Sequence, residues 1–167
     1  EVERTEGVTE ANELQLRYSR AVAPFWDAQL GWRAHLGPGP ERHWLVAGLR
    51  GLAPYWFDTD LALFADADGR TALRIEAEYE LLFTQRLILS PDLEVNVYGQ
   101  DDRATGAGSG LSDVEFGLRL RYEIRRELAP YVGLVGWRKF GDSANFARQQ
   151  GERSDDLQWV IGVRTWF

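Results

Sequence analysis

The stretch between residues 73 and 98 constrains the fold most, because apolar and charged residues alternate along it. In residues 73–83 every second residue is apolar or aromatic, and most residues between them are charged. The alternation resumes over residues 87–97. A period of two is that of a β-strand, whereas a helical face here would run into Glu76 and Glu80. The stretch therefore predicts a long β-hairpin.

The length of these strands narrows the fold further. Strands of soluble sandwiches average about 5–6 residues. A strand that crosses a membrane in a β-barrel needs about 9–11 residues, with apolar side chains facing lipid and polar ones facing the interior. A soluble sandwich is the alternative, but its exposed Trp and Phe would form a larger apolar patch than monomers tolerate. The pattern favours a transmembrane β-barrel.

The same alternation recurs along the chain and predicts nine strands. We expect them at residues 14–22, 28–35, 44–52, 57–65, 73–83, 87–97, 114–126, 132 to about 140, and 157–167. Three of the four tight connections contain an Ala-Pro-aromatic sequence, beginning at Ala23, Ala53 and Ala129. Longer connections are expected at 37–41, 65–69, 99–112 and 141–156. This asymmetry is typical of short periplasmic turns and longer outer loops.

The strand count bears on closure, because bacterial barrels close with even numbers. We expect one domain over residues 1–167, an all-β antiparallel barrel of about 8–10 strands with a tenth strand upstream. Residues 1–12 are acidic and are expected to be a loop or the remnant of a strand, and residues 1–4 could supply part of the tenth. Phe167 ends the last strand on its apolar side, which resembles the recognition signal of bacterial outer-membrane barrels. The expected location is therefore the bacterial outer membrane.

Composition and motifs exclude several functions. The formal net charge is −7 without a basic patch, which argues against nucleic acid as a partner. The absence of Cys excludes disulfides and thiolate metal sites. An outer-membrane lipase or protease is the competing class, but Ser109 lies in a Gly-Ser-Gly loop without the strand-turn-helix setting of a nucleophile elbow, and no histidine is placed to serve it. We expect that the chain is not an enzyme.

Seven segments distributed over the chain carry a family resemblance. They are GLAPYWF at 51–57, DGRTALR at 68–74, EAEYELL at 76–82, TQRLIL at 84–89, GSGLS at 108–112, GLRLRYEIRRE at 117–127 and APYVG at 129–133. In these segments the chain resembles the copper resistance protein B family, outer-membrane proteins associated with bacterial copper resistance. The resemblance covers most of residues 26–167.

The resemblance implies an outer-membrane barrel involved in copper resistance and homeostasis, which binds copper or assists its export. Copper ions, outer-membrane lipid and a periplasmic copper protein are the implied partners. Family members usually carry a Met- and His-rich amino-terminal extension suited to Cu(I) and Cu(II). This chain has no Met and only His35 and His43. The alternative is a structural barrel with a plugged ionic lumen that anchors such an extension or docks a periplasmic partner.

Strand phase also predicts which charged residues face the lumen. The candidates are Asp58, Asp60, Glu76, Glu78, Glu80, Glu94, Glu115 and Glu123, with Arg74, Arg119 and Arg121 among them. They would line a cation path, or pair with one another and fill a narrow interior. His35 and His43 flank the Gly-Pro loop and could hold Cu(II) or Zn(II) at the outer rim. The acidic loops at 66–68 and 101–102 could hold Ca²⁺.

Overall fold

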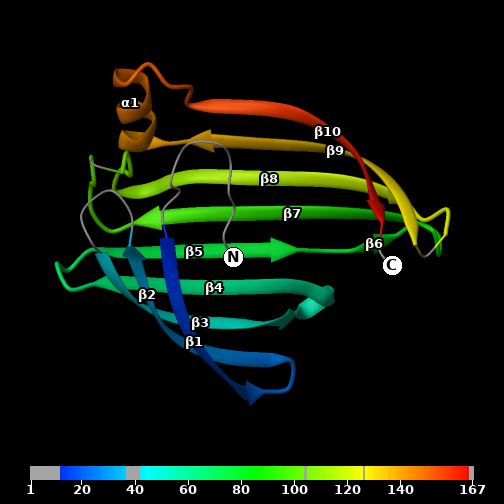
Figure 1. The fold of residues 1–167 in the computed structure, drawn as a ribbon, viewed down its shortest axis with the longest axis horizontal. Helices are drawn as coiled ribbons and strands as arrows, with labels where there is room; N and C mark the ends of the chain where they lie inside the picture. Colours follow the sequence, from blue (N-terminus) through cyan, green and yellow to red (C-terminus); the bar gives the residue numbers. More distant parts are fainter. Residues whose placement is uncertain (1–11, 37–41, 104, 126, 166–167) are drawn as a thin grey trace.

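The computed structural model describes residues 12–36, 42–103, 105–125 and 127–165, which form one antiparallel β-sheet. Its strands are β1 (Asn12–Ala23), β2 (Trp26–Leu36), β3 (Arg42–Ala53), β4 (Phe57–Asp66), β5 (Thr71–Glu78), β6 (Leu81–Leu82), β7 (Leu87–Tyr98), β8 (Gly110–Tyr122), β9 (Leu128–Lys139) and β10 (Asp155–Thr165). Each long strand pairs with the next, and the short β6 pairs with β7 (Figure 1). The predicted all-β antiparallel fold is confirmed.

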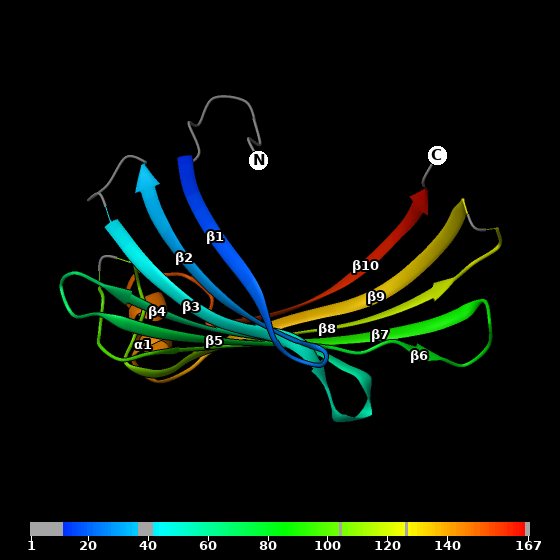
Figure 2. The ribbon, with the colours of Figure 1, turned by 90° about the horizontal axis from the view of Figure 1, so that it is seen from below.

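The sheet is bent into a trough, with β1 and β10 at its two rims (Figure 2). Neighbouring strands are antiparallel throughout the order from β1 to β10, so these two edge strands run in the same direction. The described residues do not pair them, so closure stays a prediction. A direct seam would be parallel, whereas one further strand could be antiparallel to both edges. The residues expected to supply part of that strand, 1–4, lie outside the described residues, as do the predicted terminal aromatic and the loop at 37–41.

The two sides of the sheet differ in chemistry. We call the side carrying Asp60, Glu76 and Glu94, which are paired in register across β4, β5 and β7, the polar face. The opposite side is the apolar face. Four of its side chains, Leu30, Leu45, Trp159 and Ile161, are 64%, 67%, 76% and 82% exposed. Soluble proteins rarely expose a continuous apolar surface of this kind, so it requires a cover other than water.

The polar face is the more enclosed side. The buried side chains of Val46, Phe64 and Ile88 lie on it, at positions in phase with its acidic residues. Curvature produces this difference, because neighbouring side chains converge on the inside of a bent sheet and diverge on the outside. The polar face is therefore the concave side of the trough, as strand phase predicts.

The predicted outer loop at 141–156 contains a helix, α1 (Gly141–Gln149). Its buried residues are Ser143, Ala144, Phe146 and Ala147. Ser143 fixes the helix to the sheet, because its Oγ lies 2.7 Å from Ser112 Oγ and accepts a hydrogen bond of 2.6 Å from the Gly108 N–H. The loop prediction was wrong because this short polar segment carries too few apolar residues for a clear helical period. No helix in the described part of the chain is long and apolar enough to cross a membrane.

The turn predicted at Ala129 is also misplaced. The chain reverses earlier, where the Ile124 N–H donates to the Leu128 carbonyl at 3.2 Å. Ala129 and Pro130 therefore lie within β9, and Pro130 pairs with Val163 of β10. The other two Ala-Pro-aromatic sequences do form tight turns, between β1 and β2 and, as the 3-10 turn η1 (Pro54–Trp56), between β3 and β4.

The first strand of the predicted central hairpin is divided into β5 and β6. The Tyr79 N–H donates to the Pro91 carbonyl at 3.0 Å. Pro91 has no N–H with which to return the hydrogen bond, so the ladder is interrupted at this point. The interruption lies directly beside Glu78 and Asp92, which are paired in register.

Candidate functional site

Two rows of carboxylates cross the middle of the polar face. In the first row, Asp60 of β4 pairs with Glu76 of β5, Glu76 with Glu94 of β7, and Glu94 with Glu115 of β8. In the second row, Asp58, Glu78 and Asp92 are paired in the same way. Like charges placed directly opposite one another destabilise a sheet. Their repetition over neighbouring strands points to a role other than stability.

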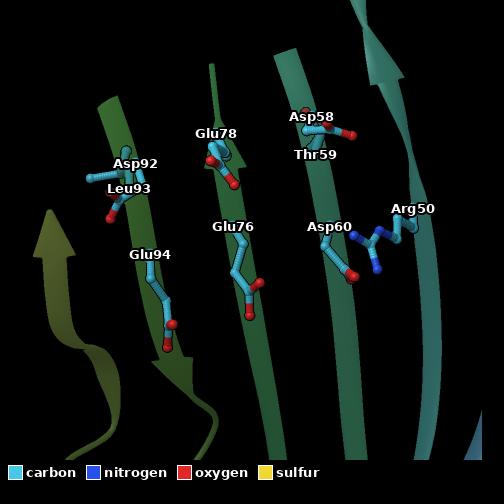
Figure 3. Close-up of a pocket in the computed structure, with 10 residues that line it drawn as sticks. Arg50, Asp58, Thr59, Asp60, Glu76, Glu78, Asp92, Leu93 and Glu94 are labelled. Atoms are coloured by element: carbon cyan, nitrogen blue, oxygen red, sulfur yellow. The ribbon is translucent and has the colours of Figure 1, made fainter. Parts of the chain in front are cut away.

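All residues of these rows except Glu115 line a pocket of about 210 Å³. Its charged lining consists of Arg50, Asp58, Asp60, Glu76, Glu78, Asp92 and Glu94. Figure 3 shows the acidic side chains projecting from three neighbouring strands, with Arg50 reaching toward Asp60 from β3. Six carboxylates with one guanidinium give the pocket a strongly negative charge. Five of the six carboxylates are sequence candidates.

Asp92 was missed as a site residue, although its strand phase places it on the polar face. Gly117 of β8 lies opposite, and a side chain there would collide with the Asp92 carboxylate. The glycine therefore leaves room for the acid. Sequence reasoning could have used the run Asp92-x-Glu94-x-Asn96, but it could not place Asp92 beside Glu78 and Asp58 without the register.

Arg74 partly neutralises one side of the pocket. Its Nε donates to Asn96 Oδ1 at 3.1 Å and lies 3.3 Å from Glu94 Oε1, and its Nη1 lies 3.9 Å from Glu76. Asn96 in turn donates to Glu94 and Asp113, both at 2.8 Å. Within the described residues, no ion pair within 4 Å involves the four remaining pocket acids, Asp58, Asp60, Glu78 and Asp92. The lumen acids are therefore only partly balanced.

The remaining lumen candidates gather elsewhere, in a cluster closer to the short turns. Arg121 lies 3.3 Å from Glu80 and 3.7 Å from Glu123. The guanidinium of Arg119 lies over the ring of Tyr131, at 5.2 Å from its centroid. The arginines pair with acids or rings here, as expected of an interior filled by opposite charges. None of these residues lines the acidic pocket.

The two histidines occupy register positions on opposite faces of the sheet. His35 pairs with Arg42, whereas His43 pairs with Ala34. The His43 ring stacks on Trp32 with centroids 5.4 Å apart, which places it on the apolar face. The side chain of His35 lies outside the described residues, so the metal-ligand role of the two histidines stays a prediction. The register does not support a metal site shared by the two histidines, because it places them on opposite faces.

The acidic outer loops already hold a cation, the guanidinium of Arg70. It lies 3.6 Å from Asp66, 2.9 Å from Asp68 and 3.4 Å from Asp102, and so ties two loops together. Across the part of the chain that the structure describes, no group of three or more His, Cys, Asp or Glu side chains has the geometry of a metal site. The loops and the acidic pocket therefore resemble charged surfaces rather than preformed coordination spheres.

Asp101 makes one outer loop sensitive to acid. The Ser109 N–H donates a hydrogen bond of 2.6 Å to its Oδ1, which holds the pKa of Asp101 below its ordinary value. A lowered folded pKa means that the stabilisation is present above the ordinary pKa of about 3.9 and is lost as pH falls through the folded value. We expect the Ser109 amide to be protected from hydrogen exchange at about pH 5 and to lose protection as the pH falls through the lowered pKa of Asp101. Asp101→Asn should remove this pH dependence, and an unchanged profile would contradict the assignment.

The donor set of the acidic pocket limits its chemistry. Carboxylate oxygens suit hard and borderline cations such as Cu(II), whereas Cu(I) prefers the sulfur ligands that this chain lacks. The rows of carboxylates, only partly balanced by arginines, would concentrate cations near the pocket. Attraction of hydrated cations fits this arrangement better than tight coordination.

Comparison with known proteins finds a matching family model and relatives of the same family. The family described as copper resistance protein B precursor matches residues 1–167. The chain is 46% identical over 168 residues to Copper resistance protein B of Escherichia coli, and 45% identical over 167 residues to a Copper resistance protein B homolog of Pseudomonas syringae pv. tomato. All of this chain is covered in both cases, but only 56% and 57% of the relatives, so it spans little more than half their length.

A solved structure resembles the fold. A NanC porin matches with a TM-score of 0.56, over 93% of this chain and 78% of the porin chain, at 13% sequence identity. At this identity the likeness concerns the fold alone. It is consistent with a β-barrel whose strands follow one another around the sheet.

Proposed function

The chain belongs to the copper resistance protein B family, and from this premise we propose that it forms part of an outer-membrane β-barrel that contributes to copper resistance. In this proposal the acidic pocket attracts copper ions and assists their export across the outer membrane. The observation that carries it is the pocket itself, in which Asp58, Glu78 and Asp92 and also Asp60, opposite Arg50, make no ion pair within 4 Å to a described arginine or lysine. The barrel has no catalytic role in this proposal.

The apolar face supports the membrane part of the proposal. Trp159 and Ile161 are among its most exposed residues, although apolar groups of this size favour burial. Lipid would cover them, while the polar face would line the interior. Outer-membrane lipid is therefore the first partner that we propose, and copper ions and a periplasmic copper protein are the others.

A structural barrel is the second candidate, favoured by the arginine contacts. Arg74 and Arg121 each approach two carboxylates, so that ion pairs occupy the polar face on either side of the pocket. The chain also has no Met to hold Cu(I). In this alternative the barrel anchors a Met- and His-rich segment or docks a periplasmic partner, and the pocket plays no part in copper handling.

Titration with Cu(II) and Cu(I) of the protein refolded in detergent tests the proposal. We expect Asp58→Asn/Glu78→Gln/Asp92→Asn to weaken Cu(II) binding at least about tenfold, because each carboxylate attracts a divalent cation about 6 Å away by on the order of 1 kcal/mol even in water. Glu123→Gln is the matched control, since Glu123 lies beside Arg121 outside the pocket. Equal binding by all three proteins would reject the pocket. Binding only by a longer chain with a Met- and His-rich segment would favour the structural barrel.

A further inference from the structure

The polar face changes from acidic to basic along β8. From the middle of this strand toward the short turns, the residues on that face are Glu115, Gly117, Arg119 and Arg121. Gly117 lies opposite Asp92, a residue of the acidic pocket, and Arg119 lies opposite Ser90. The strands β7, β8 and β9 lie side by side (Figure 1). A negative and a positive region therefore meet on neighbouring strands.

Arg119 carries an unpaired positive charge at this boundary. Among the described residues, no carboxylate lies within 4 Å of its guanidinium, which lies over the Tyr131 ring of β9. Asp92 is nevertheless close, because its carboxylate lies over Gly117, two residues before Arg119 on the same face. Two residues of a strand span about 7 Å. Asp92 and Arg119 are therefore opposite charges that lie near one another without pairing.

Two further hydrogen-bond donors beside Arg119 lack an acceptor. The side chain of Arg121 is 12% exposed, and its buried Nε has no hydrogen-bond partner among the described residues. Tyr131 pairs with Arg121 in the register, and its hydroxyl makes no hydrogen bond within the described part of the chain. Buried polar atoms are almost always satisfied, so an unsatisfied donor requires an explanation. We call Arg119, Arg121 and Tyr131 the anion subsite, because each offers a donor to an acceptor that the fold does not supply.

The acidic pocket and the anion subsite together match a ligand with one positive and one negative end. Cu(II) stands highest among the divalent first-row metals in its affinity for nitrogen and oxygen ligands, so small molecules with an amine and a carboxylate bind it readily. In such a complex one carboxylate oxygen binds the metal, and the other can still accept hydrogen bonds. Guanidinium groups bind carboxylates through paired hydrogen bonds. A metal ion and the carboxylate bound to it can span the two regions.

We propose that the anion subsite binds the carboxylate of a copper–amino acid complex whose Cu(II) lies at the acidic pocket. The complex is held at both ends, whereas hydrated Cu(II) is attracted by the acids alone. This inference rests on the proposed function of the acidic pocket and names the form of copper that the pocket prefers. The copper keeps its amino acid ligand and its oxidation state.

Equilibrium dialysis of the protein refolded in detergent, with equal amounts of Cu(II) and isotope-labelled glycine, tests the anion subsite. The wild type should retain glycine only when Cu(II) is present. We expect Arg119→Gln to weaken glycine retention at least about tenfold, because it removes hydrogen bonds to a charged group. Binding of Cu(II) without glycine should not weaken in this variant, because Arg119 repels cations. Tyr131→Phe keeps the ring beside Arg119 and should weaken glycine retention about threefold.

Arg125→Gln is the matched control, because it removes the same charge from the turn before β9, outside the anion subsite. It should leave both measurements unchanged. Equal glycine retention by the wild type and Arg119→Gln would overturn the inference, as would retention of glycine without Cu(II). If the wild type binds Cu(II) but retains no glycine, the anion subsite fails and the proposed function of the acidic pocket stands. If the wild type binds neither, both fail.

Discussion

Arginine in place of Ile161 is expected to destabilise the protein in a lipid bilayer by about 2–4 kcal/mol, the cost of a cationic side chain near the bilayer midplane on the lipid face of a barrel. Ile161 lies near the middle of β10 on the apolar face and is 82% exposed. In a water-soluble sheet, a substitution at so exposed a position would change stability by only about 0.5 kcal/mol in either direction. The expected effect therefore depends almost entirely on what covers the apolar face.

A charge on the other face of the same strand is the matched control. Gln158 lies on the polar face, where its side chain donates to Asp156 at 2.7 Å. Gln158→Arg adds the same side chain next to a carboxylate and should change stability little. Denaturant unfolding of both variants in phospholipid vesicles gives the comparison. Equal effects of the two arginines would contradict the assignment of the apolar face to lipid.

Strand phase could be predicted from the sequence because it depends only on the alternation within each strand. Asp60 and Glu76 are predicted to share the polar face on this basis, and the structure pairs them directly. The turn before β9 was misplaced because the hydrogen bonds that close it, from Ile124 and Arg125 to Leu128, lie ahead of the Ala-Pro-aromatic sequence. The helix α1 was not foreseen because it depends on contacts with a distant segment, such as that of Ser143 with Ser112. Local pattern carries no information about such contacts.

The composition of the candidate site depends on register, which strand phase does not determine. Asp58, Glu78 and Asp92 form one row only because β4, β5 and β7 align at these residues. The register of β8 places Arg121 opposite Ile88 of β7, outside the acidic pocket, where it lies 3.3 Å from Glu80. Sequence reasoning therefore predicted which charged residues share the polar face. It did not predict that the acids gather in the pocket while Arg121 lies in a separate cluster.

Glu78→Arg is expected to stabilise the fold and to weaken the attraction of cations, so that stability and copper binding change in opposite directions. In the register, Glu78 lies directly between Asp58 and Asp92. Arginine there would replace two like-charge pairs by two opposite-charge pairs, each worth about 0.2–1 kcal/mol, so we expect a gain of about 0.4–2 kcal/mol. The same change places a guanidinium at the centre of the acidic pocket, and we expect Cu(II) affinity to fall more than about tenfold.

Denaturant unfolding and Cu(II) titration of the same preparation measure both effects. The matched control is Glu123→Arg, because Glu123 lies 3.7 Å from Arg121 and the new arginine would face a like charge. It should lower stability and leave Cu(II) binding unchanged. Repulsion between like charges that costs stability is retained where the charges serve a function. A Glu78→Arg protein that is more stable but binds copper unchanged would therefore show that the acidic rows do not bind copper. A less stable Glu78→Arg protein would contradict the repulsion between Glu78 and its two register partners, Asp58 and Asp92.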